Sequence, residues 1–149
     1  MNERGDFQIL LIDDHASDAK LFEHAMEQSS SRANLFWVAT AAEGLEFLRR
    51  EGRFDGIGRP KLVVSDLNMP GIDGFAFLRE VRQNPAVAAI PVVIFSSSRS
   101  PQDVLRCYEL GANSFVMKPM SLESFVETIG VLVRYWLDMV ELPDPALLD

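Results

Sequence analysis

Five polar or charged residues each follow an apolar run in this sequence, and their types could serve one reaction. They are Asp13, Asp14, Asp66, Ser96 and Lys118. Carboxylates that lie close together repel each other, so a cluster of them favours a divalent cation. Ligands that are all oxygen suit Mg²⁺, which keeps several waters and takes one or two carboxylates. Lys118 would add a second positive charge opposite the metal.

Asp66 ends the apolar stretch KLVVSD and is followed by the sharp turn LNMPGIDG. An aspartate can attack a phosphoryl group and form an acyl phosphate. The transferred group carries charge on three oxygens, and the metal, Lys118 and Ser96 could each face one of them. A carboxylate is already ionised at neutral pH, so no histidine base is needed. These residue types therefore indicate phosphoryl transfer to Asp66.

The five residues can meet only if the apolar runs form one sheet. Runs of strand type cover residues 7–12, 34–39, 61–66, 90–98 and 114–119, and helical patterns cover 16–30, 40–52, 73–85, 100–112 and 121–140. Strands that are apolar almost throughout are buried on both faces, which predicts a parallel sheet between two layers of helices. The fold class is therefore α/β, a doubly wound five-stranded (βα)5 sheet. The carboxyl ends of its strands share one edge, where ligands bind.

Composition narrows the class of protein. The chain has 149 residues, 48% of them hydrophobic, which suits one globular domain over residues 1–149. A net charge of −8 argues against a nucleic-acid or anionic-membrane partner. The single cysteine, Cys107, is expected to be a small buried filler. With no apolar stretch of about 18 residues and no leader pattern, we expect a cytoplasmic location.

The motifs, taken in order along the chain, resemble the response-regulator receiver domain of two-component signalling. LLIDDH matches the family's acidic pair (Asp13, Asp14), VVSDLNMPGIDG its phospho-acceptor (Asp66), PVVIFSSS its switch hydroxyl (Ser96) and FVMKP its lysine (Lys118). The match runs from about residue 7 to 140 and leaves a Pro-containing acidic tail at 141–149. It implies the flavodoxin-like receiver fold.

The resemblance also implies a mechanism. Mg²⁺ would bind Asp13, Asp14, Asp66 and the backbone carbonyl of Asn68. Asp66 would take a phosphoryl group from the phosphohistidine of a sensor histidine kinase, and Ser96 and Phe115 would form the switch that alters protein contacts. Such a protein is a signalling switch that assists its own phosphorylation and dephosphorylation, and not a turnover enzyme.

A finer resemblance rests on the 52–60 connector and the ending RYWLDMVELP. Both are similar to stand-alone receivers that serve bacterial phytochrome histidine kinases. A silent receiver that never takes phosphate, a phosphorelay intermediate and a phosphate sink remain alternatives. An aspartyl-phosphate phosphatase would need an acid where Asn68 stands, and a flavin-binding protein would need a hydroxyl- and glycine-rich loop in place of the acidic DDHASD.

The last helix predicts a partner surface. One apolar stripe, expected to face the core, contains Leu122, Val126, Ile129, Val133, Trp136 and Val140; a second stripe contains Phe125, Leu132, Tyr135 and Met139. Together they cover roughly 200° of the helix, more than one core contact needs. The second stripe would form a homodimer face, unless the tail covers it. His15 and His24 are expected to face solvent and not to act as ligands.

Overall fold

The computed structural model describes residues 9–29 and 34–148. Its centre is a parallel sheet of the strands β1 (Ile9–Ile12), β2 (Leu35–Val38), β3 (Leu62–Ser65), β4 (Val92–Ser96) and β5 (Ser114–Met117), in the order β2-β1-β3-β4-β5. β1, β3 and β4 are buried along their whole length. The predicted fold class is confirmed. Phe7, where the first strand was expected to begin, lies outside the described residues.

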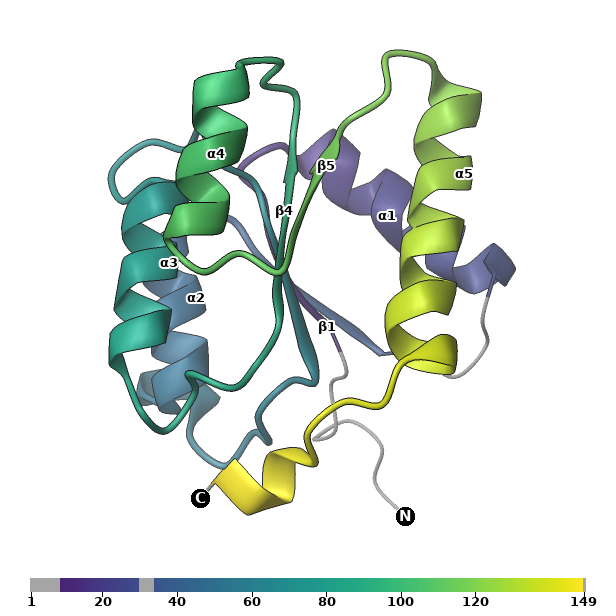
Figure 1. Cartoon of the computed structure of the whole chain (residues 1–149). Coiled ribbons are helices and arrows are strands. Elements are labelled where there is room, and N and C mark those ends of the chain that lie inside the picture. The colour runs from purple at the N-terminus through teal and green to yellow at the C-terminus, as the bar shows by residue number, and fades with distance from the viewer. Residues whose placement is uncertain (1–8, 30–33, 149) are drawn as a thin grey trace.

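Helices cover both faces of the sheet (Figure 1). α1 (Ala16–Ser29) and α5 (Leu122–Val133) pack on one face, and α2 (Ala41–Arg49), α3 (Gly74–Gln83) and α4 (Pro101–Glu109) lie on the other. Each face has its own hydrophobic core, to which alternate residues of the strands contribute. Cys107 is fully buried, as predicted, and burial raises the pKa of its thiol to about 11.

Polar side chains cap the N-termini of four helices and so fix where each helix begins. Thr40, Asp73, Ser100 and Ser121 each accept a hydrogen bond from the backbone N–H three residues ahead. These caps satisfy N–H groups that have no partner within the helix. At the start of α2 the Thr40 hydroxyl also donates to the Glu43 carboxylate at 3.2 Å.

The crevice at the carboxyl ends of the strands follows from the sheet order. β1 lies between β2 and β3, so the chain crosses back over β1 after β2 and winds in the other direction. Loops on either side of that reversal part at the sheet edge and leave room for a site. Two backbone bonds tie the strand ends together: Asp66 N–H donates to Ile12 at 2.8 Å, and Lys118 N–H donates to Ser96 at 2.7 Å.

Helix α5 buries part of the predicted core stripe and two residues of the other stripe. Ile129 and Val133 are in the core, and Val126 and Trp136 pack against it, as predicted. Phe125 and Leu132 are buried as well, whereas Leu122 is 63% exposed. The centroids of the Phe125 and Phe95 rings lie 5.3 Å apart. The assignment of Phe125 and Leu132 to an exposed partner face was therefore wrong. Beyond Val133 the helix widens into a π-helical turn, Arg134–Met139, where Tyr135 and Met139 are exposed.

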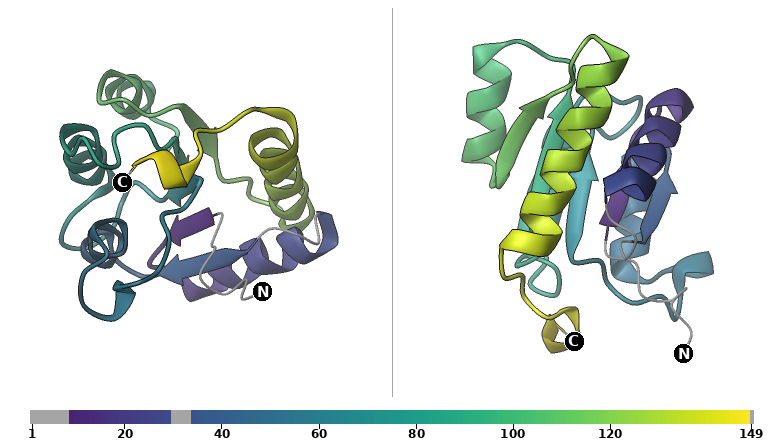
Figure 2. Two further views of the ribbon diagram at one scale, coloured as in Figure 1. Left: turned by 90° about the horizontal axis from the view of Figure 1, so that it is seen from below. Right: turned by 90° about the vertical axis from the view of Figure 1, so that its right-hand side faces the viewer.

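The tail does not cover α5. It leaves the end of the helix and crosses beneath the sheet to the other layer, where it forms a short turn, Pro145–Leu148 (Figure 2). Leu148 packs against the core on the α2 and α3 side, and its carbonyl accepts a hydrogen bond from Arg59 at 3.2 Å. Arg59 also donates to the Leu48 carbonyl, near the end of α2. The tail thus closes the lower end of the molecule.

Candidate functional site

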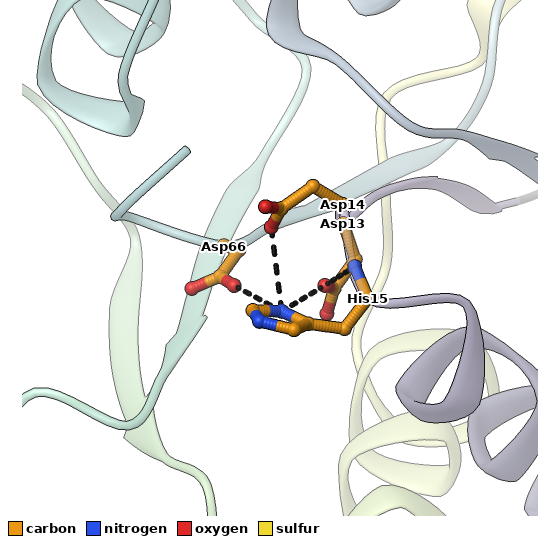
Figure 3. Close-up of side chains that lie close together, drawn as sticks. All are labelled: Asp13, Asp14, His15 and Asp66. Carbon is orange, nitrogen blue, oxygen red and sulfur yellow. Dashed lines mark hydrogen bonds and ion pairs between the residues drawn. The ribbon is translucent and has the colours of Figure 1, made fainter. Parts of the chain in front are cut away.

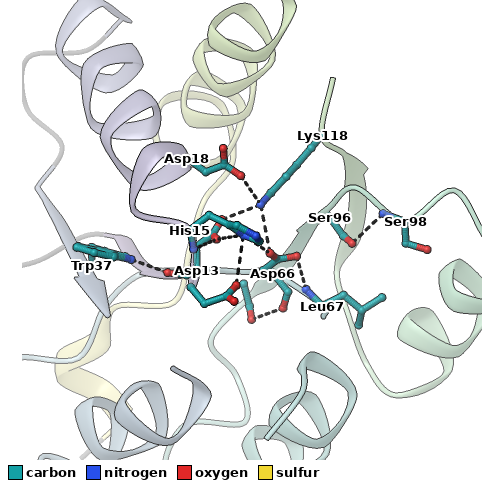
Figure 4. A network of polar contacts seen from close by, with 11 residues as sticks. Asp13, His15, Asp18, Trp37, Asp66, Leu67, Ser96, Ser98 and Lys118 are labelled. Carbon is teal, nitrogen blue, oxygen red and sulfur yellow. Dashed lines mark hydrogen bonds and ion pairs between the residues drawn. The ribbon is translucent and has the colours of Figure 1, made fainter. Parts of the chain in front are cut away.

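Four strand ends bring the predicted site residues together (Figure 4). Asp13 and Asp14 follow β1, Asp66 follows β3, Ser96 ends β4 and Lys118 follows β5. All except Asp14 are buried, although all are polar or charged. Burial of polar groups is costly unless each has a partner, so their contacts define the site.

Lys118 is the centre of the contact network. Its Nζ donates to Asp13 Oδ2 at 2.8 Å, Asp18 Oδ2 at 2.9 Å and Asp66 Oδ2 at 3.2 Å. An ammonium has three N–H donors, so all of them are used. Burial alone would lower the pKa of Lys118, but the hydrogen bonds and charges of these carboxylates outweigh it and raise that pKa. The lysine is therefore charged throughout the physiological range.

Asp66 is held on its other side by the backbone. Its Oδ1 accepts a hydrogen bond from the Leu67 N–H at 2.7 Å. Burial raises the pKa of Asp66, and the nearby Lys118 charge and the Leu67 bond oppose that shift only in part. Close packing explains why a glycine stands at position 74, at the start of α3. A Cβ there would lie 2.7 Å from the Asp66 carbonyl oxygen. The loop after β3 therefore packs closely behind the candidate nucleophile.

A cluster of metal-ligand type faces the crevice (Figure 3). One ligand atom from each of Asp13, Asp14, His15 and Asp66 lies within 4.8 Å of the others. The three carboxylates come from the ends of the neighbouring strands β1 and β3. The sequence predicted their common sheet edge but not the order of the strands. Carboxylate oxygens favour Mg²⁺ or Mn²⁺, so these residues fit a hard divalent cation. Asn68 is exposed two residues beyond Asp66, and its carbonyl remains a predicted ligand.

His15 lies closer to this cluster than the sequence suggested. Its side chain is 58% exposed, as expected, yet Nδ1 lies 3.2 Å from Asp13, 3.3 Å from Asp14 and 3.6 Å from Asp66. Its weak burial would lower the pKa of His15, but the bond to Asp13 and the charge of Asp14 raise it. Its position directly after the acidic pair was the available signal. His24 is exposed, as expected.

Three further residues, which the sequence analysis did not predict, fix the loops at this edge of the sheet. Trp37 on β2 donates its indole N–H to the Asp13 carbonyl at 2.7 Å, which fixes the chain as it leaves β1. Arg99 donates to the Lys118 carbonyl at 2.7 Å and joins the loop after β4 to the loop after β5. Asp18, in the first turn of α1, is the third partner of Lys118. Each contact depends on the tertiary fold and has no sequence motif.

The two predicted switch residues lie on neighbouring strands. Ser96 is fully buried, and its Oγ accepts a hydrogen bond from the Ser98 N–H at 3.1 Å. Ser98 in turn donates to Asp103, in the first turn of α4, at 2.7 Å. Phe115 on β5 is partly buried against the core of the α2 and α3 side. Ser96 is thus linked to the start of α4, and Phe115 to the core beside it.

Comparison with known proteins agrees with this arrangement. The family profile described as the response regulator receiver domain matches residues 9–130. The chain is a response regulator receiver domain. This receiver is 32% identical to Response regulator Rcp1 of Synechocystis over 135 residues, which cover 91% of this chain and 92% of Rcp1.

Two solved structures extend the likeness. The phosphorylated cyanobacterial phytochrome response regulator RcpA superposes with a TM-score of 0.89 at 29% identity, over 93% of this receiver and 99% of RcpA. The Mn²⁺-bound form of Rcp1 superposes with a TM-score of 0.86 at 32% identity, over 91% and 98% of the two chains. Within the described ranges, no helix of the receiver has the length and apolar character needed to cross a bilayer.

Proposed function

We propose that Asp66 is the phospho-acceptor of this receiver and takes its phosphoryl group from the phosphohistidine of a sensor histidine kinase. The observation that carries the proposal is the position of the Lys118 ammonium, which lies 2.8 Å from Asp13 and 3.2 Å from Asp66. This fixed positive charge contacts two members of the metal-ligand cluster, Asp13 and the candidate nucleophile Asp66. A transferring phosphoryl group needs positive charge at that point.

In the proposed step, a carboxylate oxygen of Asp66 attacks phosphorus as the phosphorus–nitrogen bond of the phosphohistidine breaks. The bonding electron pair stays on the imidazole nitrogen. Lys118 would donate to one phosphoryl oxygen and the Ser96 hydroxyl to another. Mg²⁺, held by Asp13, Asp14, Asp66 and the Asn68 carbonyl, would neutralise phosphoryl charge. The same groups would assist later hydrolysis of the acyl phosphate.

Phosphorylation would then act through Ser96. If its hydroxyl turns to a phosphoryl oxygen, it gives up the hydrogen bond from Ser98 N–H, whose side chain contacts Asp103 on α4. Movement of Ser96 would also open space for Phe115, which is only partly buried. The output would therefore be a changed protein surface around α4 and β5.

The proposed kinase is a phytochrome-type photoreceptor. The likeness to Rcp1 and to the phytochrome response regulator RcpA, each over nine-tenths of this chain, supports that choice. It also supports a single receiver domain as the working unit. We also propose that the protein is cytoplasmic and has no nucleic-acid partner; the net charge of −8 supports the second point.

A homodimer through α5 and β5 is also proposed. The exposed side chains Val131 and Tyr135 border a cavity of about 590 Å³ between these elements, which Val116 and Trp136 also line. Tyr135→Glu would place a charge on this surface, and Ala42→Glu on the distant α2 is the matched control. Sedimentation at micromolar concentration should give a dimer that only Tyr135→Glu disrupts. A monomer in all three proteins would contradict the proposal.

Intact-protein mass after incubation with acetyl phosphate tests the acceptor. The wild type should gain about 80 Da, one phosphoryl group, only when Mg²⁺ is present. Asp66→Asn should gain nothing, whereas Asp73→Asn, which alters a helix cap outside the site, should still gain mass. Absence of any gain in the wild type would instead favour the silent receiver.

A further inference from the structure

The third partner of Lys118 has no part in the reaction proposed above. Asp18 lies in the first turn of α1, and its carboxylate is 2.9 Å from Lys118 Nζ. Its side chain is 26% exposed, against 3% for Asp13 and 5% for Asp66. Figure 4 shows Asp18 and Asp66 on different sides of the ammonium. Asp18 therefore draws the lysine away from the proposed acceptor.

We propose that Asp18 is a positioning residue that restrains Lys118 in the unphosphorylated receiver and releases it when Asp66 carries a phosphoryl group. This inference rests on the proposed function. All three N–H donors of Nζ are already used, so full contact with a phosphoryl group requires one of them to be freed. Asp13 belongs to the predicted metal set and Asp66 carries the group. Asp18 is the partner that can leave.

The surroundings of Asp18 permit that release. Asp18 and Lys118 line a cavity of about 530 Å³, and Arg99, Leu21 and Met120 are also in its lining. A carboxylate that turns away from Lys118 can therefore enter a cavity whose lining includes a second cation, Arg99. Its partial exposure also keeps its desolvation cost low. Asp13 has neither advantage, because it is buried and its chain is held by Trp37.

Charge acts in the same direction as geometry. Three carboxylates, those of Asp13, Asp18 and Asp66, surround Lys118, and Asp14 lies in the cluster beside them. A phosphoryl group adds further negative charge. Asp18 would thus weaken phosphoryl binding both by competing for the lysine and by direct repulsion. The consequence is a receiver whose phosphorylated state is less favourable than its other site residues alone would make it.

The test compares beryllofluoride, a phosphoryl analogue, in wild type and variants at saturating Mg²⁺. Fluorine NMR of the bound analogue gives its affinity. Asp18→Asn removes the charge and should bind beryllofluoride about tenfold more tightly. Asp18→Glu restores the charge and should return the affinity towards wild type. Glu23→Gln, the same charge change on the exposed side of α1, is the matched control and should have no effect.

A second readout follows the lysine itself. In protein labelled with ¹⁵N-lysine, the Lys118 ammonium signal should shift on beryllofluoride binding in the wild type. Asp18→Asn should move the signal of the unbound protein towards the bound position. Equal or weaker analogue binding by Asp18→Asn would overturn the inference while leaving the proposed function intact. If the wild type itself binds no beryllofluoride, both the proposed function and this inference fail.

Discussion

Replacing Lys118 with methionine would leave two buried carboxylates without their ammonium partner. Lys118 is 6% exposed, and its partners Asp13 and Asp66 have side chains only 3% and 5% exposed. Methionine has similar length and fills the same space, so the change removes charge and hydrogen bonds with little loss of packing. Breaking a buried ion pair by removing one partner costs about 3–5 kcal/mol.

The lower part of that range is expected here. The carboxylates lie at the edge of the sheet, and the His15 ring, 3.2 Å from Asp13, can supply some positive charge. We therefore expect Lys118→Met to lower the free energy of unfolding by about 3 kcal/mol without metal. A domain of this size is commonly stable by about 5–15 kcal/mol, so the variant should still fold.

The pH dependence of the loss is a further check. The pKa of Asp66 is raised in the folded protein, so the folded state binds that proton more tightly than the unfolded state does. Stability from this group is therefore lost as pH rises from its ordinary pKa of 3.8 through the raised pKa. Without Lys118 the carboxylate should be still easier to protonate. The deficit of Lys118→Met should then be smaller near pH 5 than near pH 8.

Urea unfolding in EDTA measures these differences, with Asp66→Asn as the second arm of a double-mutant cycle. Asp66→Asn should be more stable than wild type at neutral pH, because ionisation of Asp66 opposes folding. In that background Lys118→Met should cost about 2 kcal/mol less than it does alone. A loss below about 1 kcal/mol, or an equal loss in both backgrounds, would refute the assignment of Lys118 as the charge partner of Asp66.

Three shorter predictions concern neighbouring residues. NMR titration of His15 should give a pKa above the ordinary value of 6.5, and Asp14→Asn should lower that pKa; an unchanged value would contradict the contact. Gly74→Ala should cost about 1–3 kcal/mol in urea unfolding and slow acetyl phosphate labelling, because its Cβ would meet fixed backbone atoms. Arg82 donates to the Gly111, Ala88 and Ile90 carbonyls. Arg82→Lys should therefore melt as early as Arg82→Met, since an ammonium cannot reproduce the planar fork.

The sequence was sufficient to predict the sheet and the residues at its edge. Buried strands read as unbroken apolar runs, and parallel strands must end at one edge, so the amino-acid order alone brings Asp13, Asp66 and Lys118 together. Their assignment to one site required only the order of elements along the chain.

Residues that depend on how layers pack could not be predicted in this way. Asp18 reaches Lys118 because the start of α1 approaches the end of β5, a contact between residues 100 positions apart. Trp37 reaches the Asp13 carbonyl from the edge strand β2. The error at α5 has a similar origin. Its apolar surface is wider than one stripe, and packing against α1 and the Phe95 ring buries Phe125 together with the predicted core residues Ile129 and Val133.

The edge position of β5 has a consequence for local opening. Among the described residues β5 pairs only with β4 and is at most partly buried, whereas β1, β3 and β4 are fully buried. Edge strands of this kind exchange their amide hydrogens through partial unfolding more readily than central strands. Each opening of β5 would carry Lys118 away from the carboxylates. Any change that binds Lys118 more tightly should therefore slow amide exchange along β5, and acyl-phosphate formation would be detectable in a strand that never touches the phosphorus.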